Sequence, residues 1–378
     1  MGDAMRAHRA RTTVVTAVAA LTVSLLTAGG ACATETRDET PDETPTSSAP
    51  ATGSGEATPP GAFSEPAGIR ELSAGWSMPW GADWLPDGSA LYTERDTHRV
   101  VHLAPDGTRT VIGTVPDVVH GGEGGLLGLA VSPGFATDRT LYVFHTAASD
   151  NRIARLTWDG ETLGGYETIL TGIAKASIHN GGRLAFGPDG HLYATTGDAA
   201  DPQLAQDPAA LEGKILRITT DGDPAPGNPF GTPVYSLGHR NAQGLAWDDE
   251  GRLWSSELGQ NTWDELNLIE PGANYGWPEC EGVCGREGFT DPKETWSTAE
   301  ASPSGLAYAD GSLYMAALRG QRLWRIPVEG TDTGTPQAYY QGEVGRQRTV
   351  LTTPSGDALW LSTSNGPGGD AVHRVTLQ

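Results

Sequence analysis

Lysine is almost absent from this sequence. Three of its 25 basic residues are lysine (Lys175, Lys214 and Lys293), so arginine supplies the other 22, and 47 acidic residues bring the formal net charge to −22. Binding along a nucleic-acid backbone requires a basic stripe that neutralises phosphates. A chain this acidic is therefore predicted not to bind nucleic acid, and the places where its few cations gather become informative.

Long apolar runs are equally scarce. Hydrophobic residues make up 37% of the chain, and the one long uncharged run, residues 12–28, follows three arginines and precedes the small residues 29–31. A basic start, a short apolar run and small residues before a cleavage point are typical of a secretory signal peptide. A single such run excludes a multi-pass membrane protein. We therefore predict that residues 1–31 are a signal peptide and that the protein is exported.

Cysteine is also rare, with three in 378 residues. The first, Cys32, follows Gly-Gly-Ala, which resembles a bacterial lipobox. Acylation of Cys32 would make the protein a cell-surface lipoprotein, and simple secretion is the alternative. The other two, Cys280 and Cys284, lie close together in PECEGVCG. An oxidising compartment favours a local disulfide between them, with two free thiols or half of a metal site as the alternatives.

The segment after Cys32 has little to bury. Residues 32–66 are mostly threonine, proline, serine and acidic residues. Such a composition cannot offset the entropy of ordering the chain. We predict a disordered acidic tether here, followed by a folded domain over residues 67–378, and we expect contact with a membrane only through an N-terminal lipid anchor.

The folded domain repeats one pattern six times. Glycine-rich turns begin near residues 86, 133, 188, 249, 310 and 354, and each separates two strands with alternating apolar residues. Short alternating strands, Asp-Gly turns and a period of roughly 50 residues are typical of four-stranded propeller blades. The predicted fold class is all-β, a six-bladed β-propeller with four-stranded antiparallel blades. Pairing of residues 69–74 with the final blade is expected to close the ring.

Propellers bind ligands above the central channel, so residues that interrupt the blade pattern are candidate site residues. GGEGGLLG (121–128) surrounds Glu123 with glycines that let backbone approach a ligand, although a plain tight turn is the alternative. Its spacing does not match a dinucleotide fingerprint. SIHNGGRL (177–184) places His179 just before an inner strand, and Asp198 ends the partner strand, where it can orient the imidazole. A lone histidine, however, is more often structural or exposed.

Later blades carry further interruptions. YSLGHRNAQG (235–244) groups several polar side chains between strands, and residues 255–278 combine acids, exposed carbonyls and aromatic residues. Arginines follow strands of the last blades. The candidates from these segments are His239, Arg240, Asn241, Gln243, Arg319, Arg346 and Arg348.

At these motifs the chain resembles the soluble glucose/sorbosone dehydrogenases, also called aldose sugar dehydrogenases. Members of this family use pyrroloquinoline quinone (PQQ) and calcium on a six-bladed propeller. The resemblance rests on GEGGLLG, HNGGRL, LGHRNAQG, DELNLI and NYGWP, in this order, and it covers essentially the whole folded domain.

The resemblance implies a role for each candidate. His179 would be the general base, and Asp198 the acid that orients it. Contacts with PQQ are implied for Glu123, Arg240, Asn241, Gln243, Arg319, Arg346 and Arg348. The backbone carbonyls of Gly259 and Gln260 would hold the catalytic calcium, while Glu265 and Tyr275 match positions that bind a further calcium in some members.

Two positions depart from the family pattern. Glu123 stands where better-known members have a glutamine that contacts cofactor or sugar. Leu306 stands where some glucose-oxidising relatives have a sugar-contacting tyrosine. The resemblance therefore does not imply a preference for glucose.

The chemistry of PQQ agrees with the arginine pattern. PQQ is a planar quinone with three carboxylates, and the arginine fork binds carboxylates in a bidentate manner. Calcium prefers oxygen ligands and acts as a Lewis acid. A neutral imidazole can remove the proton of the sugar C1 hydroxyl while hydride moves to the quinone.

We therefore predict a PQQ- and calcium-dependent oxidation of aldose sugars at C1 to the lactone, with electrons passed to an external acceptor. A calcium-dependent lactonase-type hydrolase and a non-catalytic propeller that binds sugar or protein are the alternatives. The arginine set favours the dehydrogenase, because a lactonase requires acids around one metal.

Overall fold

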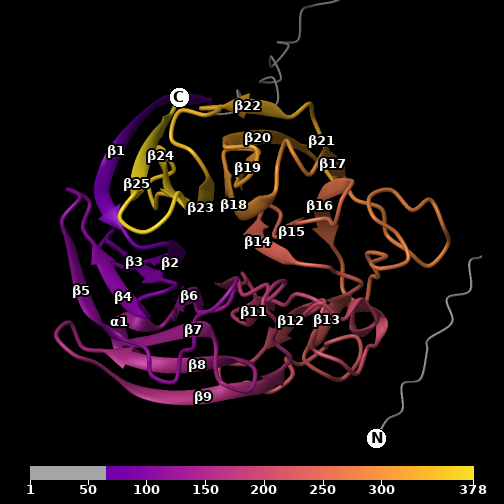
Figure 1. Cartoon of the computed structure of the whole chain (residues 1–378), viewed down its shortest axis with the longest axis horizontal. Coiled ribbons are helices and arrows are strands. Elements are labelled where there is room, and N and C mark those ends of the chain that lie inside the picture. The colour runs from indigo at the N-terminus through magenta and orange to yellow at the C-terminus, as the bar shows by residue number, and fades with distance from the viewer. Residues whose placement is uncertain (1–64) are drawn as a thin grey trace, which may run out of the picture. The chain divides into compact units, whose positions relative to one another are not determined.

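Six antiparallel sheets form a closed ring in the computed structural model, which describes residues 65–378 (Figure 1). This confirms the prediction of an all-β, six-bladed propeller. The predicted signal peptide, Cys32 and all but the last two residues of the predicted tether lie outside the described residues.

The blades follow one another along the chain. Blade 1 contains β2 (Pro79–Trp84), β3 (Ala90–Glu94), β4 (Arg99–Leu103) and β5 (Arg109–Thr114). Blade 2 contains β6 (Leu126–Val131), β7 (Thr140–Thr146), β8 (Asn151–Trp158) and β9 (Leu163–Ile173). Blade 3 contains β10 (Leu184–Phe186), β11 (Leu192–Thr195), β12 (Lys214–Ile218) and β13 (Val234–Leu237).

The second half of the ring is built in the same way. Blade 4 contains β14 (Ala242–Trp247), β15 (Leu253–Glu257), β16 (Trp263–Ile269) and β17 (Glu294–Ser297). Blade 5 contains β18 (Pro303–Ala309), β19 (Ser312–Ala317), β20 (Arg322–Glu329), β21 (Asp332–Thr333) and β22 (Gln337–Tyr339). Blade 6 contains β23 (Gln347–Thr352), β24 (Ala358–Thr363), β25 (Asp370–Leu377) and β1 (Pro66–Trp76). Two short helices, α1 (Phe135–Asp138) and η1 (Pro202–Gln206), lie between strands.

Blade 5 departs from the predicted four strands. Both β21 and β22 pair with β20, so this sheet has five strands. Gly334 and Pro336 lie between them. Proline has no backbone N–H to donate to a sheet, and glycine weakens a strand. The outermost strand of this blade is therefore interrupted, and its two pieces share one neighbour.

Ring closure follows the predicted pairing. β1 pairs antiparallel with β25, with Ile69 opposite Val375 and Ala74 opposite Ala371. The pairing continues beyond the strand, because the backbones of Glu65 and Gln378 exchange two hydrogen bonds of 2.8 and 3.0 Å. In Figure 1 the indigo strand β1 lies on the outside of the yellow final blade. The two ends of the described chain thus share one sheet.

The inner strands approach one another closely around the channel. A Cβ added to Gly128 would lie 2.2 Å from the carbonyl oxygen of Gly182, and one added to Gly305 would lie 2.8 Å from that of Arg348. Only a residue without a side chain permits this distance between backbones. Apolar side chains pack between blades, as Trp80, Leu127 and Leu184 do in one core cluster.

The antiparallel order of the strands separates two ends of the ring. The six predicted turns join the first and second strands of each blade at one end, which we call the turn end. Longer connections, including 115–125, 174–183, 196–213 and 258–262, lie at the other end, which we call the loop end. Within residues 65–378 no helix is long and apolar enough to span a bilayer. The loops that carry Glu123, His179 and Gly259 thus open at one end of the propeller.

Candidate functional site

A cavity of about 410 Å³ opens at the loop end. Its walls include Trp80 on β2, Glu123 from the loop before β6, and three arginines, Arg95, Arg346 and Arg348. Of the predicted residues, Glu123, Gln243, Arg346 and Arg348 line it. The structure thus brings together side chains from opposite ends of the sequence around one space.

Arg348 is buried in the wall of this cavity and forms no ion pair within residues 65–378. Its guanidinium is bonded by neutral groups, the Gln243 side-chain oxygen at 3.4 Å and the Ser364 hydroxyl at 3.3 Å. Its Nε has no hydrogen-bond partner among the described residues. Burial, followed by the positive charges of Arg95 and Arg346, lowers the pKa of Arg348 to about 9, although the charges of Glu123 and Asp370 act in the opposite direction. An anion in the cavity would relieve this repulsion.

Arg183, which the sequence analysis did not single out, places a further positive charge near Arg348, although its side chain lines a separate cavity between the inner strands. It is buried, and its guanidinium carbon lies 4.4 Å from the centre of the Trp80 ring. Its Nε donates to the Gln243 carbonyl at 2.8 Å. Burial lowers its pKa to about 9, and Arg348 contributes to the shift. Arg183 lies inside the HNGGRL motif, which could have marked it as a candidate. Trp80 and Arg95, which line the cavity, lie in none of the motifs.

His179 and Asp198 meet at this end of the propeller as predicted. His179 Nδ1 lies 2.7 Å from Asp198 Oδ1, and Arg240 Nη2 lies 2.8 Å from His179 Nε2. A guanidinium can only donate, so Nε2 must carry the lone pair and Nδ1 the proton. The structure therefore holds the imidazole neutral, with its basic nitrogen directed away from the aspartate.

Asp198 is well prepared to stay ionised. It is fully buried, and burial raises its pKa, but hydrogen bonds from His179, the Ala200 backbone and the Trp277 indole outweigh burial and lower the pKa overall. The indole Nε1 donates to Asp198 Oδ2 at 2.8 Å. The carboxylate is therefore a fixed negative charge beneath the imidazole.

The backbone of His179 is held in an unusual conformation. Its φ of 57° lies in the left-handed region, which is uncommon for residues other than glycine. Glu123 Oε2 accepts the His179 backbone N–H at 2.8 Å, and the Ala199 N–H bonds the His179 carbonyl at 3.1 Å. Glu123 also accepts the Asn241 side-chain amide at 3.4 Å. Glu123 thus holds the histidine loop in addition to lining the cavity.

Arg240 connects the histidine to a pair of backbone carbonyls. Its Nη1 donates to the carbonyl oxygens of Leu258, at 3.1 Å, and Gly259, at 2.6 Å. Its Nε has no partner within the described part of the chain. The carbonyls predicted to hold calcium were those of Gly259 and Gln260; the structure directs those of Leu258 and Gly259 toward the cation of Arg240.

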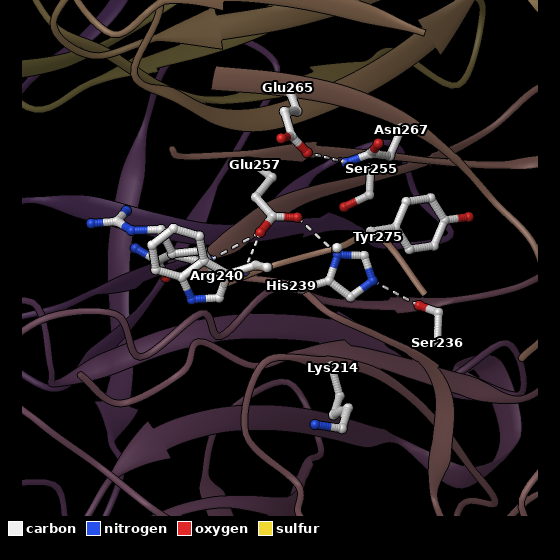
Figure 2. Close-up of polar contacts among 12 residues, drawn as sticks. Lys214, Ser236, His239, Arg240, Ser255, Glu257, Glu265, Asn267 and Tyr275 are labelled. Carbon is white, nitrogen blue, oxygen red and sulfur yellow. Dashed lines mark hydrogen bonds and ion pairs between the residues drawn. The ribbon is translucent and has the colours of Figure 1, made fainter. Parts of the chain in front are cut away.

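A buried histidine–glutamate pair supports the backbone of this segment (Figure 2). Glu257 Oε2 lies 2.8 Å from His239 Nδ1, and the Ser236 hydroxyl lies 2.8 Å from His239 Nε2. The other oxygen, Oε1, accepts the backbone N–H groups of Arg240 and Asn241. Asn241 in turn accepts the Gly181 N–H at 3.0 Å, and it does not line the cavity. Glu257 and Asn241 therefore hold the backbone of neighbouring loops in place.

Glu265 and Tyr275, predicted to bind a further calcium, lie beside this pair. Glu265 is opposite Glu257 across two strands, and burial, then the charge of Glu257, raise its pKa to about 8. The Tyr275 hydroxyl already donates to the Leu268 carbonyl at 2.6 Å. Within residues 65–378 no three histidine, cysteine, aspartate or glutamate side chains are grouped to hold a metal. The metal-binding role of both residues stays a prediction.

Of the predicted positions outside the cavity wall, Arg319 and Leu306 have no other contact, within residues 65–378, with the site described above. Arg319 is exposed and is not part of the cavity wall, although its neighbour Leu318 is. Leu306 is buried and lines a separate cavity of about 280 Å³, together with Leu245 and Val350 from the inner strands. Leu306 is thus not part of the wall of the arginine-lined cavity.

The predicted cysteine pair is confirmed as a disulfide. Cys280 and Cys284 are joined, with their Cα atoms 5.5 Å apart. The bridge lies in the long connection between β16 and β17, and Cys280 follows Trp277 by three residues.

Comparison with known proteins places this geometry among the sugar-oxidising propellers. A PQQ-bound aldose sugar dehydrogenase from Streptomyces coelicolor has 52% sequence identity and a TM-score of 0.81, over 85% of this chain and 100% of that one. Quinoprotein glucose dehydrogenase B of Acinetobacter calcoaceticus is 34% identical over 244 residues, 54% of this chain and 51% of that protein. Aldose sugar dehydrogenase YliI of Escherichia coli is 28% identical over 77% of this chain and 88% of its own length.

Together with the six-bladed ring, these similarities define a class of protein: a sugar dehydrogenase, which is an oxidoreductase. The family model for glucose/sorbosone dehydrogenases matches residues 76–372, nearly the whole described domain. The chain belongs to the glucose/sorbosone dehydrogenase family.

Proposed function

We propose that this protein oxidises aldose sugars at C1 to the lactone, using PQQ and calcium, and passes the electrons to an external acceptor. One observation carries the proposal: an arginine-lined cavity lies at the same end of the channel as a neutral imidazole whose basic nitrogen carries the lone pair. The family membership and the PQQ-bound S. coelicolor relative support it.

The cavity has the chemistry that PQQ requires. A tricarboxylate needs several cations that are free of other anions. Arg348 is bonded by neutral groups and has an unpartnered Nε among the described residues, and Arg346 lies beside it in the wall. Arg348 and Arg346 would therefore bind carboxylates of the cofactor, and Gln243 would orient Arg348 from behind.

The carbonyl pair fits a calcium ion. Backbone carbonyl oxygens are typical calcium ligands. The carbonyls of Leu258 and Gly259 already attract a cation, because both accept hydrogen bonds from the Arg240 guanidinium. When bound, PQQ supplies the hydride acceptor and calcium supplies Lewis-acid polarisation.

His179 would perform the proton transfer. Its Nε2 exchanges the bond with Arg240 for one with the sugar C1 hydroxyl and accepts the hydroxyl proton, while C1 loses hydride and becomes the lactone carbonyl. Asp198 keeps the proton on Nδ1 and stabilises the imidazolium that forms. Glu123 holds the histidine loop through the backbone N–H.

Reconstitution tests this function. Purified protein is mixed with PQQ and Ca²⁺, and reduction of an artificial dye is followed across a panel of aldoses, with lactone hydrolysis assayed in parallel. We expect dye reduction only when both PQQ and an aldose are present. Absence of dye reduction across the panel, or hydrolysis of lactones instead, would contradict the proposal.

We also propose that the protein is exported and anchored through acylated Cys32. Cys32→Ala is expected to move the protein from the membrane fraction to the soluble extracellular fraction, because a lipid chain is the only predicted anchor. Radiolabelled palmitate incorporation into the wild type provides the direct measurement. Wild-type protein without label, found in the medium, would favour simple secretion.

A further inference from the structure

One carboxylate outside the cavity gathers the backbone of the carbonyl-bearing loop. Glu281 Oε1 accepts the backbone N–H groups of four consecutive residues, 260–263, at 2.8, 2.8, 2.8 and 3.1 Å. Burial raises the pKa of Glu281, but these hydrogen bonds outweigh burial and the pKa is lowered overall. The loop therefore turns around an ionised carboxylate.

The Cys280–Cys284 loop that carries Glu281 is itself tied to the blade. The Cys280 backbone N–H donates to the Gly276 carbonyl at 2.9 Å, and the Gly282 N–H donates to Glu265 at 2.7 Å. The Cys284 N–H donates to Asp291 at 2.7 Å. The disulfide closes this short loop, so the backbone that carries Glu281 is held in place on both sides.

The two loops also pack directly. A Cβ added to Gly282 would lie 2.7 Å from the Trp263 ring, so that ring lies against the backbone of the disulfide loop. Gly259 leaves similarly little room, because its Cβ would lie 1.8 Å from the Trp263 carbonyl. Its N–H is held by Asp264 at 2.9 Å. The direction of the Leu258 and Gly259 carbonyls thus depends on the 260–263 turn.

We propose that Glu281 is a positioning residue that, held by the Cys280–Cys284 loop, directs the Leu258 and Gly259 carbonyls toward the bound cation. Glu281 is not part of the cavity wall; its carboxylate bonds the 260–263 turn, and its charge also acts on Arg240. The inference rests on the proposed function, because the cation concerned is the calcium proposed there. Groups that bond the ligands of a metal without touching the metal fix the orientation of those ligands.

Glu281→Ala tests the inference, with Glu279→Ala as the matched control. Glu279 is in the same connection and has the same charge, but its nearest cation is Arg286 at 3.9 Å and both side chains are about half exposed. Calorimetric titration of the full chain, saturated with PQQ, is expected to show calcium binding roughly 10-fold weaker in Glu281→Ala and nearly unchanged in Glu279→Ala. Saturating calcium is expected to restore kcat in Glu281→Ala.

Hydrogen exchange provides a readout that needs neither cofactor nor activity. In the metal-free chain, the backbone amides of residues 260–263 are expected to exchange faster in Glu281→Ala than in Glu279→Ala, because four hydrogen bonds to one carboxylate are lost. A second variant, Cys280→Ser with Cys284→Ser, is expected to weaken calcium binding in the same direction. This variant keeps Glu281 and removes only the disulfide that holds its backbone.

The outcomes separate the two proposals. If the wild type binds neither PQQ nor calcium, the proposed function fails. If the wild type binds both and Glu281→Ala binds calcium as tightly, the positioning role of Glu281 alone is overturned. Loss of kcat in Glu281→Ala that saturating calcium does not restore would also overturn it.

Discussion

Two histidine–carboxylate pairs lie in neighbouring loops of this propeller and differ mainly in what the second ring nitrogen meets. His179 is 2.7 Å from Asp198, and His239 is 2.8 Å from Glu257. His179 Nε2 accepts from Arg240 at the site, with 13% of its side chain exposed, whereas fully buried His239 meets the Ser236 hydroxyl. A short bond to a carboxylate therefore does not by itself mark a catalytic histidine.

The two pairs are coupled through one residue. Arg240 bonds His179 through its side chain and Glu257 through its backbone. The buried pair thus supports the arginine, and the arginine contacts the His179–Asp198 pair. We expect substitutions in the first pair to change turnover and substitutions in the second to change stability first.

His179→Gln is expected to have the largest effect on turnover. Glutamine retains a polar side chain but cannot take up the hydroxyl proton, so kcat should fall by roughly 10²- to 10⁴-fold. PQQ binding should change little, because the cavity arginines remain. Steady-state kinetics together with a PQQ titration provide the measurement, and unchanged kcat would remove His179 as the base.

Asp198→Asn should reduce turnover less, by roughly 100-fold, because the base remains but its tautomer is no longer fixed. The amide can donate to Nδ1 and place the proton on Nε2, the wrong nitrogen. The control is His179→Gln combined with Asp198→Asn. A double variant no slower than His179→Gln supports a shared role, whereas additive losses would show that the two residues act separately.

His239→Gln is expected to lower the free energy of unfolding more clearly than it lowers kcat. Loss of the buried ring leaves Glu257 or Ser236 incompletely bonded, which costs about 1–3 kcal/mol of the free energy of unfolding. We expect kcat to fall by less than about 10-fold, since Arg240 keeps its other contacts. Denaturant unfolding and kinetics on one preparation test this, and a loss of kcat equal to that of His179→Gln would break the distinction between the two pairs.

The stability of the protein in acid tests the Asp198 carboxylate of the first pair, and here we expect the smallest effect. The pKa of Asp198 is lowered from its ordinary value of 3.8, so its ionised form stabilises the fold above about that pH, and this contribution is lost as pH falls below it. The stability difference between wild type and Asp198→Asn should therefore shrink below pH 3.8. Thermal unfolding between neutral pH and acid tests this, and a difference independent of pH would contradict it.

The architecture could be predicted because its signals are local. Each Asp-Gly turn and each alternating strand lies within one blade, so the repeat was visible, and only the interruption at Gly334 and Pro336 changed the strand count. His179 and Asp198 were found because motif and resemblance agreed. The local pattern was therefore sufficient to predict the ring and the contact between His179 and Asp198.

The remaining site residues depend on contacts between distant segments. Arg183 bonds the carbonyl of Trp80, 103 residues away, and no motif announces that contact. Glu281 stands between Cys280 and Cys284, and the sequence analysis assigned a role to the two cysteines but none to the glutamate. The resemblance matched Leu306 to a sugar-contacting tyrosine of some relatives, but in this structure the inner strands bury its side chain. Sequence shows which residues are unusual, but the ring decides which of them face the cavity.

The most direct test of the PQQ site compares two arginines that the sequence analysis treated alike. Apo-protein is titrated with PQQ and followed by absorbance in the wild type, Arg348→Gln and Arg319→Gln. Arg348 lines the cavity and lacks a charged partner, so we predict roughly 10- to 100-fold weaker binding for Arg348→Gln, whereas exposed Arg319→Gln should bind like the wild type. Equal affinities for all three proteins, or no binding by the wild type, would contradict the account.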